Sequence, residues 1–223
     1  MARPYVILNA AMTLDGKIAT REGDSQISCK EDLKRTHELR AEVDAIMVGV
    51  GTVLIDNPSL TVRRARGENP IRVIVDGFAK TPTNARVLDG SAPTIIALTE
   101  KVDNREKERL RSAGAQLISV GEDEVDLPQL LERLHERGIK RLLLEGGSTL
   151  NWSMISQGLV DEIRVAVAPV VVGGENSKTL VGGLGFKKIA EGAKFELTDF
   201  KRVGEDLLLI YRARGDKSAQ KVG

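Results

Sequence analysis

The chain has 223 residues, of which 41% are hydrophobic and 29% are charged. This length and composition are sufficient for one sizeable core, so we expect a single domain of the α/β class over residues 1–223. The 33 Lys and Arg residues nearly balance the 32 Asp and Glu residues, and the net charge of +1 gives no general attraction to nucleic acids or to acidic membranes. One cysteine excludes an intramolecular disulfide, and with only two histidines beside it we expect no metal site of the zinc type.

The N-terminal part of the chain predicts a strand, a turn and a helix. Residues 5–12 are mostly apolar and indicate a central strand, which runs into an Asp15-Gly16 turn. No signal-peptide pattern precedes this strand, and no apolar run approaches the roughly 20 residues of a membrane span. We therefore expect a soluble, cytoplasmic protein without membrane contact. Residues 28–31 match a capping box, which predicts the start of a helix that carries Arg40.

The middle of the chain alternates strand and helix patterns. Strands are predicted at residues 45–50, 72–76, 94–98 and 116–120, and helices at residues 103–113 and 126–137. Such alternation argues for a largely parallel sheet with right-handed crossovers. The first of these strands is followed by Gly51 and a short helical turn that ends at Pro58, which makes a junction of strand, glycine and helix.

The stretch Arg141–Trp152 reads RLLLEGGSTLNW and contains a second such junction. Three consecutive leucines suit a strand buried on both faces, and a helix capped by Ser148 or Thr149 should follow the double glycine. Free N–H groups at such a helix start favour an anion, most often a phosphate, although a tight turn without a ligand explains the same pattern equally well. The carboxylate of Glu145 at the end of the strand favours a ligand site.

Beyond Gly158 the pattern changes from alternating elements to strands alone. Residues 162–172 and 195–211 contain strands with no long helix between them, and these strands should therefore pair antiparallel. Several glycines between residues 173 and 185 predict a long loop of functional importance, such as a lid. Residues 215–223 are expected to form a frayed tail.

Residues with catalytic chemistry of their own are few. Cys29 lies beside a helix cap without a partner, and His37 and His135 fall within helical patterns as structural or surface groups, so no nucleophile set is evident. What remains is a set of glycines, small hydroxyls and carboxylates at strand ends, together with dispersed arginines. This inventory suits an enzyme whose cofactor carries the reactive atom.

Several short segments together resemble one enzyme family. They are TLDGK at residues 13–17, GTV at 51–53, DNP at 56–58, LTVR at 60–63 and LEGG at 144–147. In this order they resemble the reductases of riboflavin biosynthesis, in particular the stand-alone archaeal branch, which is similar to the reductase half of the bacterial bifunctional deaminase-reductase. The resemblance covers almost the whole chain, and the sequence contains no zinc-deaminase signature.

The resemblance implies a fold, a cofactor and an oligomeric state. The fold would be the three-layer αβα arrangement of dihydrofolate reductase, with a mostly parallel central sheet and an antiparallel C-terminal hairpin. The cofactor would be NADPH, with NADH as an alternative, and the enzyme would be a homodimer. Positions that match cofactor contacts of the family are Thr52, Asp56, Asp76, Gly77, Gly146, Gly147, Ser148, Thr149, Leu150, Asn151, Gly173 and Gly174.

The resemblance also implies a substrate and a reaction. The substrate would be 2,5-diamino-6-(5-phosphoribosylamino)pyrimidin-4(3H)-one, and its open-chain imine would accept a hydride at C1′ to give the ribitylamino product. Glu145 and Asp56 are the candidates for relaying protons and for stabilising the cationic iminium. Arginine is suited to the substrate phosphate because its fork binds two oxygens at once. Positions that match substrate contacts are Ser25, Arg40, Leu60, Arg63 and Glu145.

Two other functions are compatible with these patterns. A dihydrofolate-reductase-like enzyme acting on a pterin would not need a pair of phosphate-binding arginines. A nucleotide-binding regulator that retains the fold without chemistry would bind NADPH but would not oxidise it when the pyrimidine substrate is supplied.

Overall fold

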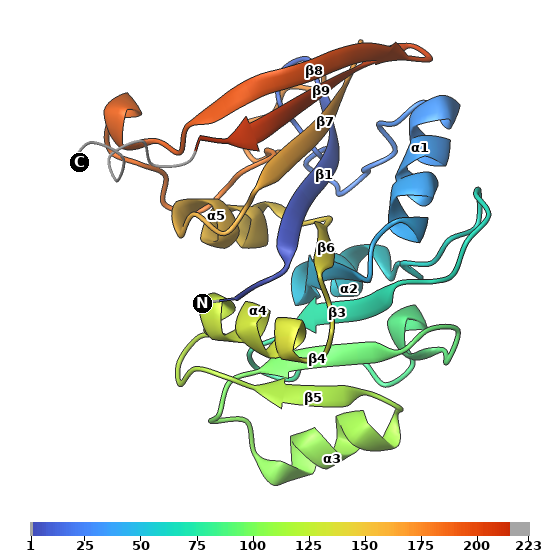
Figure 1. Ribbon diagram of the computed structural model, residues 1–223, viewed down its shortest axis with the longest axis vertical. Coiled ribbons are helices and arrows are strands. Elements are labelled where there is room, and N and C mark those ends of the chain that lie inside the picture. Colours follow the sequence, from blue (N-terminus) through green and yellow to red (C-terminus); the bar gives the residue numbers. More distant parts are fainter. Residues whose placement is uncertain (1, 215–223) are drawn as a thin grey trace, which may run out of the picture.

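The computed structural model describes residues 2–214, which form one nine-stranded sheet with helices on both sides (Figure 1). The strands are β1 (Tyr5–Thr13), β2 (Ala45–Gly49), β3 (Ile71–Val75), β4 (Thr94–Leu98), β5 (Gln116–Ser119), β6 (Arg141–Leu144), β7 (Glu162–Ala168), β8 (Phe195–Val203) and β9 (Asp206–Ala213). The α-helices are α1 (Lys30–Ala41), α2 (Val50–Asp56), α3 (Asn104–Ser112), α4 (Leu127–Glu136) and α5 (Ser148–Ser156). The expected tail at residues 215–223 lies outside the described residues.

The order of strands across the sheet is β5-β4-β3-β2-β6-β1-β7-β9-β8. All neighbours from β5 to β7 are parallel, whereas β9 is antiparallel to both β7 and β8. The predicted combination of a parallel sheet and an antiparallel C-terminal hairpin is therefore confirmed. The chain builds outward from β1 to β5 and then returns to insert β6 between β2 and β1. Ligands bind in open α/β sheets at the carboxyl ends of the strands where the order reverses, which here are those of β2, β6 and β1.

Different helices cover the two faces of the sheet. Leu39 of α1, Val53 of α2 and Leu110 of α3 belong to one core cluster. Leu134 of α4 and Met154 of α5 belong to a second cluster on the other face. Because the central strands are enclosed between these two helical layers, the fold is the expected three-layer αβα arrangement.

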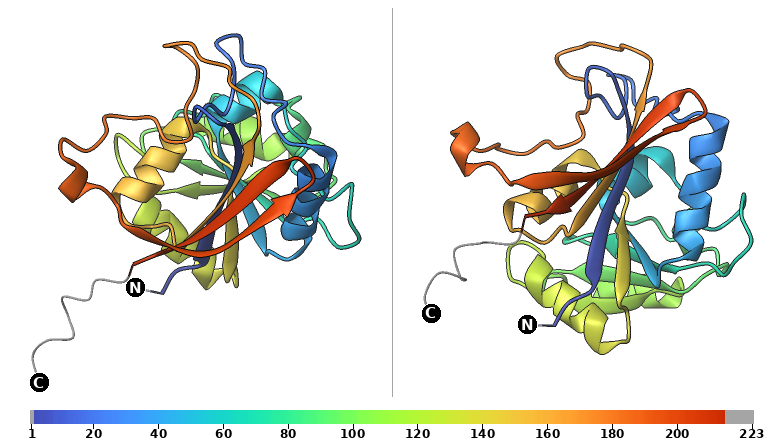
Figure 2. Two further views of the ribbon diagram at one scale, coloured as in Figure 1. Left: turned by 90° about the horizontal axis from the view of Figure 1, so that it is seen from above. Right: turned by 45° about the horizontal axis from the view of Figure 1, so that its top comes forward.

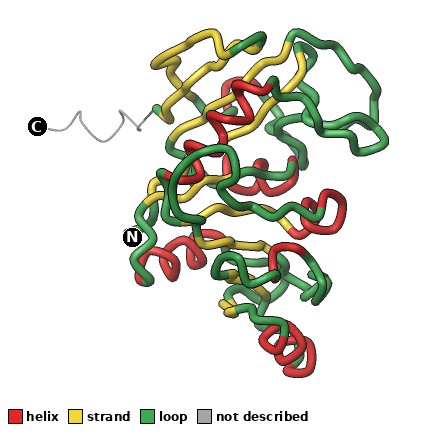
Figure 3. The backbone as a smooth tube through the Cα atoms, turned by 90° about the vertical axis from the view of Figure 1, so that its right-hand side faces the viewer, coloured by secondary structure: helices red, strands yellow, loops and turns green. Residues whose placement is uncertain are grey.

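The C-terminal edge of the sheet is less covered than its centre. Figure 3 shows the β8–β9 hairpin at the top of the view, with no helix of the described chain above it. Most side chains of β8 are exposed, including Phe200 at 65%. The hairpin therefore presents apolar surface to its surroundings.

Two long loops meet beyond the carboxyl end of β1. Figure 2 shows residues 14–29, in blue, beside the orange loop that follows β7. The Leu14 N–H donates to Val170 O at 2.8 Å, and the Ile18 N–H donates to Lys178 O at 2.8 Å. The predicted loop of residues 173–185 is thus held against the turn after β1.

The start of α1 differs by one residue from the predicted capping box. Cys29, rather than Ser28, is the N-cap, and its sulfur accepts a hydrogen bond from the Asp32 N–H at 3.4 Å. The Ser28 hydroxyl donates instead to the Asp32 carboxylate at 2.8 Å. The same carboxylate accepts a hydrogen bond from Arg35 at 2.7 Å. Because the Ser28 hydroxyl is bonded to Asp32, the next residue, Cys29, caps the helix.

Residues 2–214 contain neither a membrane-spanning helix nor a group of side chains that could bind a metal ion. No helix in this range is both long and apolar enough to cross a bilayer. No three His, Cys, Asp or Glu side chains in the same range are grouped so that they could hold a metal ion.

Candidate active site

Two strand-to-helix junctions meet at the carboxyl edge of the sheet. β2 leads directly into α2, β6 leads into α5, and the two strands are parallel neighbours. The Gly49 N–H donates to Gly146 O at 2.7 Å, and the Thr52 hydroxyl accepts a hydrogen bond from the Gly147 N–H at 3.1 Å. The leucines of β6 are fully buried. This strand therefore fixes Glu145 and the double glycine next to the first turn of α2.

The N-terminus of α5 is open to a ligand. Its N-cap is Gly147, so the predicted caps Ser148 and Thr149 are wrong. Glu145 and Gly146 complete the turn out of β6, with a φ of 89° at Gly146 that favours glycine, and Ser148 is already helical. Among the described residues no side chain caps the helix, which leaves first-turn N–H groups without intrahelical acceptors. These groups, at the positive end of the helix dipole, favour an anion.

The loop between β7 and β8 lies across the first turn of α5. The Gly182 N–H donates to Ser148 O at 3.1 Å, and the Asn151 side-chain amide donates to a main-chain carbonyl of the loop at 2.8 Å. A Cβ at Gly183 would lie only 2.1 Å from the Trp152 ring, so a side chain would push the loop away from the helix. The predicted loop thus forms a wall beside the helix start.

The side-chain oxygen of Asn151 is a buried hydrogen-bond acceptor without a partner among residues 2–214, and a bound cofactor could supply the missing donor. The residue is 2% exposed, and its Oδ1 makes no hydrogen bond within the described chain. A Cβ at Gly146 would lie 3.4 Å from this amide, so the oxygen is close to the double glycine. An unpaired buried acceptor is costly unless a ligand or water supplies a donor. A nicotinamide dinucleotide fits, because it offers hydroxyl and carboxamide donors and a diphosphate that suits the helix N-terminus.

Asp15 fastens the base of the same loop. Its carboxylate accepts hydrogen bonds from the Thr13 hydroxyl at 2.6 Å and from the N–H groups of Val172 at 3.2 Å and Gly173 at 2.7 Å. The Thr13 bond, followed by the main-chain bonds, lowers the pKa of Asp15 to about 2. Asp15 therefore does more than form a turn, and the N–H of Gly173, a predicted cofactor contact, is directed at this carboxylate.

Glu145 and Arg40 form a bidentate ion pair. Arg40 Nε and Nη2 donate to the two carboxylate oxygens at 2.9 and 2.7 Å, and the two side chains are only 14% and 12% exposed. Burial would lower the pKa of Arg40, but the charge of Glu145 and the hydrogen bonds to it outweigh burial and raise that pKa. Arg40 Nη1 also donates to the Thr61 carbonyl at 3.2 Å. The guanidinium assigned from the sequence to the substrate phosphate is thus directed at the candidate catalytic carboxylate.

Arg63 lies beside this pair on an irregular segment. Its N–H donates to His37 Nδ1 at 3.0 Å, and its guanidinium donates to the Thr61 hydroxyl at 3.0 Å. Partial burial lowers the pKa of Arg63, and the charges of Arg40 and Arg86 lower it further. Because these cations disfavour one another, a phosphate bound at Arg63 would relieve their repulsion.

Asp56 ends α2 one turn beyond Thr52. Residues four apart lie on the same face of a helix, so Asp56 shares the face that reaches Gly147 through Thr52. Partial burial raises the pKa of Asp56 above its usual value. The site thus contains two carboxylates in different surroundings, since Glu145 is paired with an arginine and Asp56 is perturbed by burial alone.

Some predicted contact residues turn their side chains away from the site. Asp76 is fully buried, and its carboxylate accepts hydrogen bonds from the Lys80 N–H and from the N–H and hydroxyl of Thr81. It therefore shapes the turn after β3. Leu60 and Leu150 are 2% and 8% exposed, with their side chains in the two core clusters. Only the main chain of these leucines is available to a ligand.

Three other predicted contacts lie at the margins of the site. The Gly77 carbonyl accepts a hydrogen bond from the Thr99 hydroxyl at 2.8 Å, at the carboxyl ends of β3 and β4. Gly174 follows the Asp15 attachment with a φ of 85°. Ser25 is exposed, on a loop that passes close to α2, since a Cβ at Gly23 would lie 3.6 Å from Ile55 Cγ2. No hydrogen bond among the described residues brings any of the three to Glu145 or Arg63.

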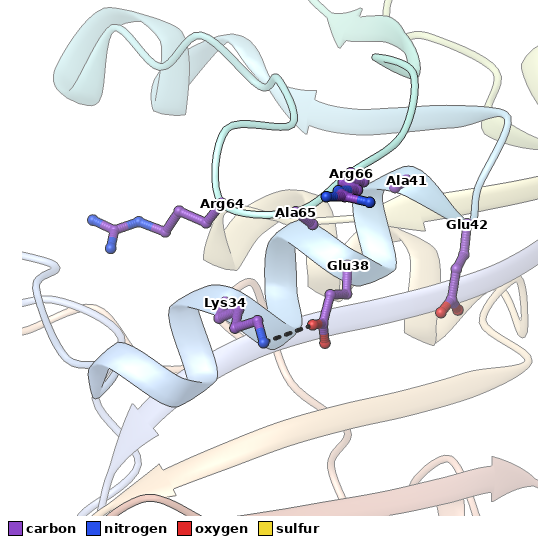
Figure 4. Close-up of a pocket in the computed structure, with 7 residues that line it drawn as sticks. All are labelled: Lys34, Glu38, Ala41, Glu42, Arg64, Ala65 and Arg66. Atoms are coloured by element: carbon purple, nitrogen blue, oxygen red, sulfur yellow. Dashed lines mark ion pairs between the residues drawn. The ribbon is translucent and has the colours of Figure 1, made fainter.

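A surface hollow of about 580 Å³ lies between α1 and residues 64–66 (Figure 4). Lys34 and Glu38 line it and form an ion pair at 3.5 Å, and Glu42 lines it one turn further along the helix. Figure 4 shows Arg64 directed away from the helix. The lining has mixed charge, because Lys34, Arg64 and Arg66 accompany Glu38 and Glu42, and it includes none of the predicted site residues.

The patterns in the sequence do not mark His37 as part of the site, and they mark Asp15 only as a turn residue within the TLDGK segment. His37 precedes Arg40 by three residues and so shares its helix face, which is the one signal available in the sequence. The Asp-Gly turn pattern is enough to explain an aspartate at position 15, so nothing in the sequence indicates its hydrogen bond with the Gly173 N–H.

Known proteins resemble this chain over nearly its full length. The family model described as the RibD C-terminal domain matches residues 4–209. The chain is 55% identical over 216 residues to the 2,5-diamino-6-ribosylamino-4(3H)-pyrimidinone 5′-phosphate reductase of Methanothermobacter thermautotrophicus, a match that covers 96% of this chain and 100% of that protein. A protein of the same name from Aquifex aeolicus is 48% identical over 195 residues, covering 85% of this chain and 87% of that one.

A solved structure has the same fold. Acinetobacter baumannii RibD, form 2, matches with a TM-score of 0.82 and 26% sequence identity. The match covers 95% of this chain but 58% of that longer one. From the family model and the two close relatives, the chain belongs to the RibD C-terminal domain family.

Proposed function

We propose that this chain catalyses the NADPH-dependent reduction of the ribosyl group of 2,5-diamino-6-(5-phosphoribosylamino)pyrimidin-4(3H)-one to the ribitylamino product in riboflavin biosynthesis. The two relatives described above bear the name of this reductase. The observation that carries the proposal is that an uncapped helix start and a buried Glu145–Arg40 pair lie on either side of one double glycine. An anion-binding surface for a nucleotide thereby adjoins an oriented carboxylate suited to a cationic reaction centre.

The cofactor half of the proposal rests on α5. When bound, a reduced nicotinamide supplies the hydride. First-turn N–H groups between Gly147 and Asn151 would bind the diphosphate, and Asn151 Oδ1 would accept a hydrogen bond from a cofactor donor. The family resemblance favours NADPH over NADH, and the ratio of kcat/KM for the two nucleotides tests this choice.

The substrate half rests on Arg63. Arg40 is committed to Glu145, so Arg63 is the proposed ligand of the substrate phosphate. Its guanidinium has a hydrogen bond to the Thr61 hydroxyl and lies among cations that lower its pKa. A phosphate dianion would offset this repulsion and accept charge-assisted hydrogen bonds.

The two carboxylates suit different steps. Arg40 fixes the orientation of the Glu145 carboxylate, and the lone pairs that Arg40 does not use are suited to stabilise the positive charge of the iminium at C1′. Opening of the ribose ring requires a proton at the ring oxygen. Asp56, whose pKa is raised by burial, is suited to donate it.

Replacing Asp56 with asparagine should lower kcat about tenfold and remove a pH dependence from the rate. The protonated carboxyl is the proposed donor, so the wild-type rate should fall as pH rises through the raised pKa of Asp56. Because Asp56 is only partly buried and much of the residue remains accessible to solvent, water can take over part of its role, which limits the loss. Measuring kcat from about pH 4 to about pH 8 checks this. A variant with the wild-type profile would exclude Asp56 from proton transfer.

Replacing Thr52 with valine should raise the KM for NADPH about fivefold, which corresponds to the loss of one hydrogen bond worth about 1 kcal/mol. Valine keeps the shape of threonine but cannot accept the Gly147 N–H, so the start of α5 is held less firmly. Steady-state kinetics with each substrate varied in turn checks the result. The KM for the pyrimidine should stay unchanged, and a rise in that constant alone would contradict the assignment.

The decisive experiment follows the absorbance of reduced nicotinamide with purified protein and the phosphorylated ribosylamino-pyrimidine. Substrate-dependent oxidation of NADPH, with the ribitylamino compound as product, is expected. A non-catalytic nucleotide-binding regulator would bind NADPH without oxidising it, and a pterin reductase would oxidise it with dihydrofolate instead.

A homodimer is part of the proposal, and apolar surface on the C-terminal hairpin supports it. The side chains that form this surface are Leu197, Phe200 and Leu207, which are 46%, 65% and 44% exposed. Exposed apolar side chains grouped on one hairpin are typical of a surface that contacts another protein chain. Sedimentation equilibrium gives the mass in solution, and a monomer at assay concentration would remove this part of the proposal.

A further inference from the structure

We propose that His37 is a positioning residue for Arg63: a neutral imidazole that holds the Arg63 main chain and thereby sets the place of the phosphate-binding guanidinium. The inference rests on the proposed function, because it takes Arg63 as the ligand of the substrate phosphate. His37 is 4% exposed and lies on the face of α1 that carries Arg40, and none of the proton transfers described above uses it.

The position of Arg63 depends on side chains because its surroundings are irregular. Residues 57–70 contain neither helix nor strand, so no ladder of main-chain hydrogen bonds fixes them. Two side chains bind consecutive N–H groups here. Asn69 Oδ1 accepts from the residue before Arg63 at 2.8 Å, and His37 Nδ1 accepts from Arg63 itself at 3.0 Å. Loss of the second bond would free the segment at the residue that carries the guanidinium.

The chemistry of the site restricts which side chain can take this role. A carboxylate at position 37 would accept the N–H, but it would also attract the guanidinium of Arg63 and compete with the phosphate. Lysine or arginine could not accept a hydrogen bond at all. Because a neutral imidazole accepts through Nδ1 while its proton is on Nε2, it holds the main chain and leaves the charge of Arg63 available.

Burial and, secondarily, the charges around His37 keep it in the neutral form. Burial lowers the pKa of His37 to about 4, and the charges of Arg40, Arg63 and Arg64 act in the same direction, whereas Glu145 opposes them. The imidazole therefore remains an acceptor at neutral pH. Protonation at Nδ1 would set a donor against the Arg63 N–H, so the contact should fail only in acid.

A double-mutant cycle tests the inference. We would measure kcat/KM for the phosphorylated substrate with wild type, His37→Leu, Arg63→Ala and the double variant. His37→Leu should lower kcat/KM about tenfold through KM, with kcat and the KM for NADPH changed less than about twofold. In the Arg63→Ala background the same substitution should change kcat/KM less than about twofold, because the group it positions is gone.

Two amide variants keep the test informative if His37→Leu does not fold. In His37→Asn the side-chain oxygen can take the place of Nδ1, whereas in His37→Gln the amide reaches beyond it. Asparagine should therefore restore kcat/KM to within about threefold of wild type, and glutamine should remain about tenfold lower. His135→Leu, on α4 at the opposite face of the sheet, is the matched control and should leave KM unchanged.

The outcomes separate this inference from the proposed function. The positioning role would be overturned if His37→Leu lowered kcat/KM equally in the wild-type and Arg63→Ala backgrounds, or if the two amide variants had equal kcat/KM. Neither result would affect the proposed function, provided that the wild-type protein catalyses the reaction. Wild-type protein that oxidises no NADPH with the pyrimidine substrate would overturn the proposed function and the role of His37 with it.

Discussion

Replacing Glu145 with glutamine should lower kcat by about 10²- to 10³-fold, or roughly 3–4 kcal/mol of transition-state stabilisation. Glutamine keeps the shape of the side chain and removes its charge. The proposed reaction passes through a cationic iminium, so loss of the carboxylate proposed to stabilise it acts on the transition state more than on the bound cofactor. The KM for NADPH should change less than about twofold. Single-turnover measurements of NADPH oxidation separate the chemical step from binding.

This substitution also leaves Arg40 without its counter-charge, and the experiment needs a control for that effect. Arg40 is only 12% exposed, and removal of one partner from a buried pair is destabilising in itself. In the double variant Arg40→Met with Glu145→Gln the unpaired charge is absent. If Glu145 acts in catalysis, the double variant stays as slow as the single one; recovery of kcat would assign the loss to the stranded arginine. An unchanged kcat in Glu145→Gln would remove the residue from the mechanism.

The architecture is predictable because its signals are local. The apolar leucines of β6 indicate a strand buried on both faces, and the structure places it between β1 and β2. Asp103 and Asp126, the first residues of two predicted helices, are the N-caps of α3 and α4 and accept hydrogen bonds from their first turns. Each of these features is encoded within a few residues of itself.

The Glu145–Arg40 pair is not predictable in this way. Its two members are 105 positions apart, and the family resemblance assigns Glu145 to catalysis and both residues separately to substrate contact. Nothing in either local sequence indicates that the guanidinium faces the carboxylate. The ion pair arises because α1 packs on the sheet beside the carboxyl end of β6, which is a property of the tertiary structure.

Asp76 shows a second limit of the sequence. A carboxylate at the end of a parallel strand has the same local pattern whether it faces a ligand or its own loop. Here it accepts hydrogen bonds from Lys80 and Thr81 and is fully buried. The N-cap of α5 shows the same limit. The local sequence favours Ser148 or Thr149, but the path of the chain out of β6 makes Gly147 the N-cap.

Replacing Arg63 with alanine should raise the KM for the phosphorylated substrate about 100-fold, close to 3 kcal/mol, with little change in kcat. The guanidinium is proposed to bind the phosphate in the ground state and the transition state alike, so its loss weakens binding more than chemistry. Arg63→Lys should recover part of the affinity, because lysine keeps the charge but not the two-point fork. Steady-state kinetics with the pyrimidine varied at saturating NADPH gives both constants.

Arg64 provides the matched control for this prediction. It is the neighbouring arginine, and Figure 4 shows its side chain directed away from α1, so Arg64→Ala should change KM less than about threefold. Salt provides an independent criterion. If Arg63 binds the phosphate as an ion pair, the wild-type KM should rise with ionic strength, whereas that of Arg63→Ala should rise less. Equal salt dependence in the two proteins would mean that the phosphate is held elsewhere, and the positive cluster around Arg63 would then require another explanation.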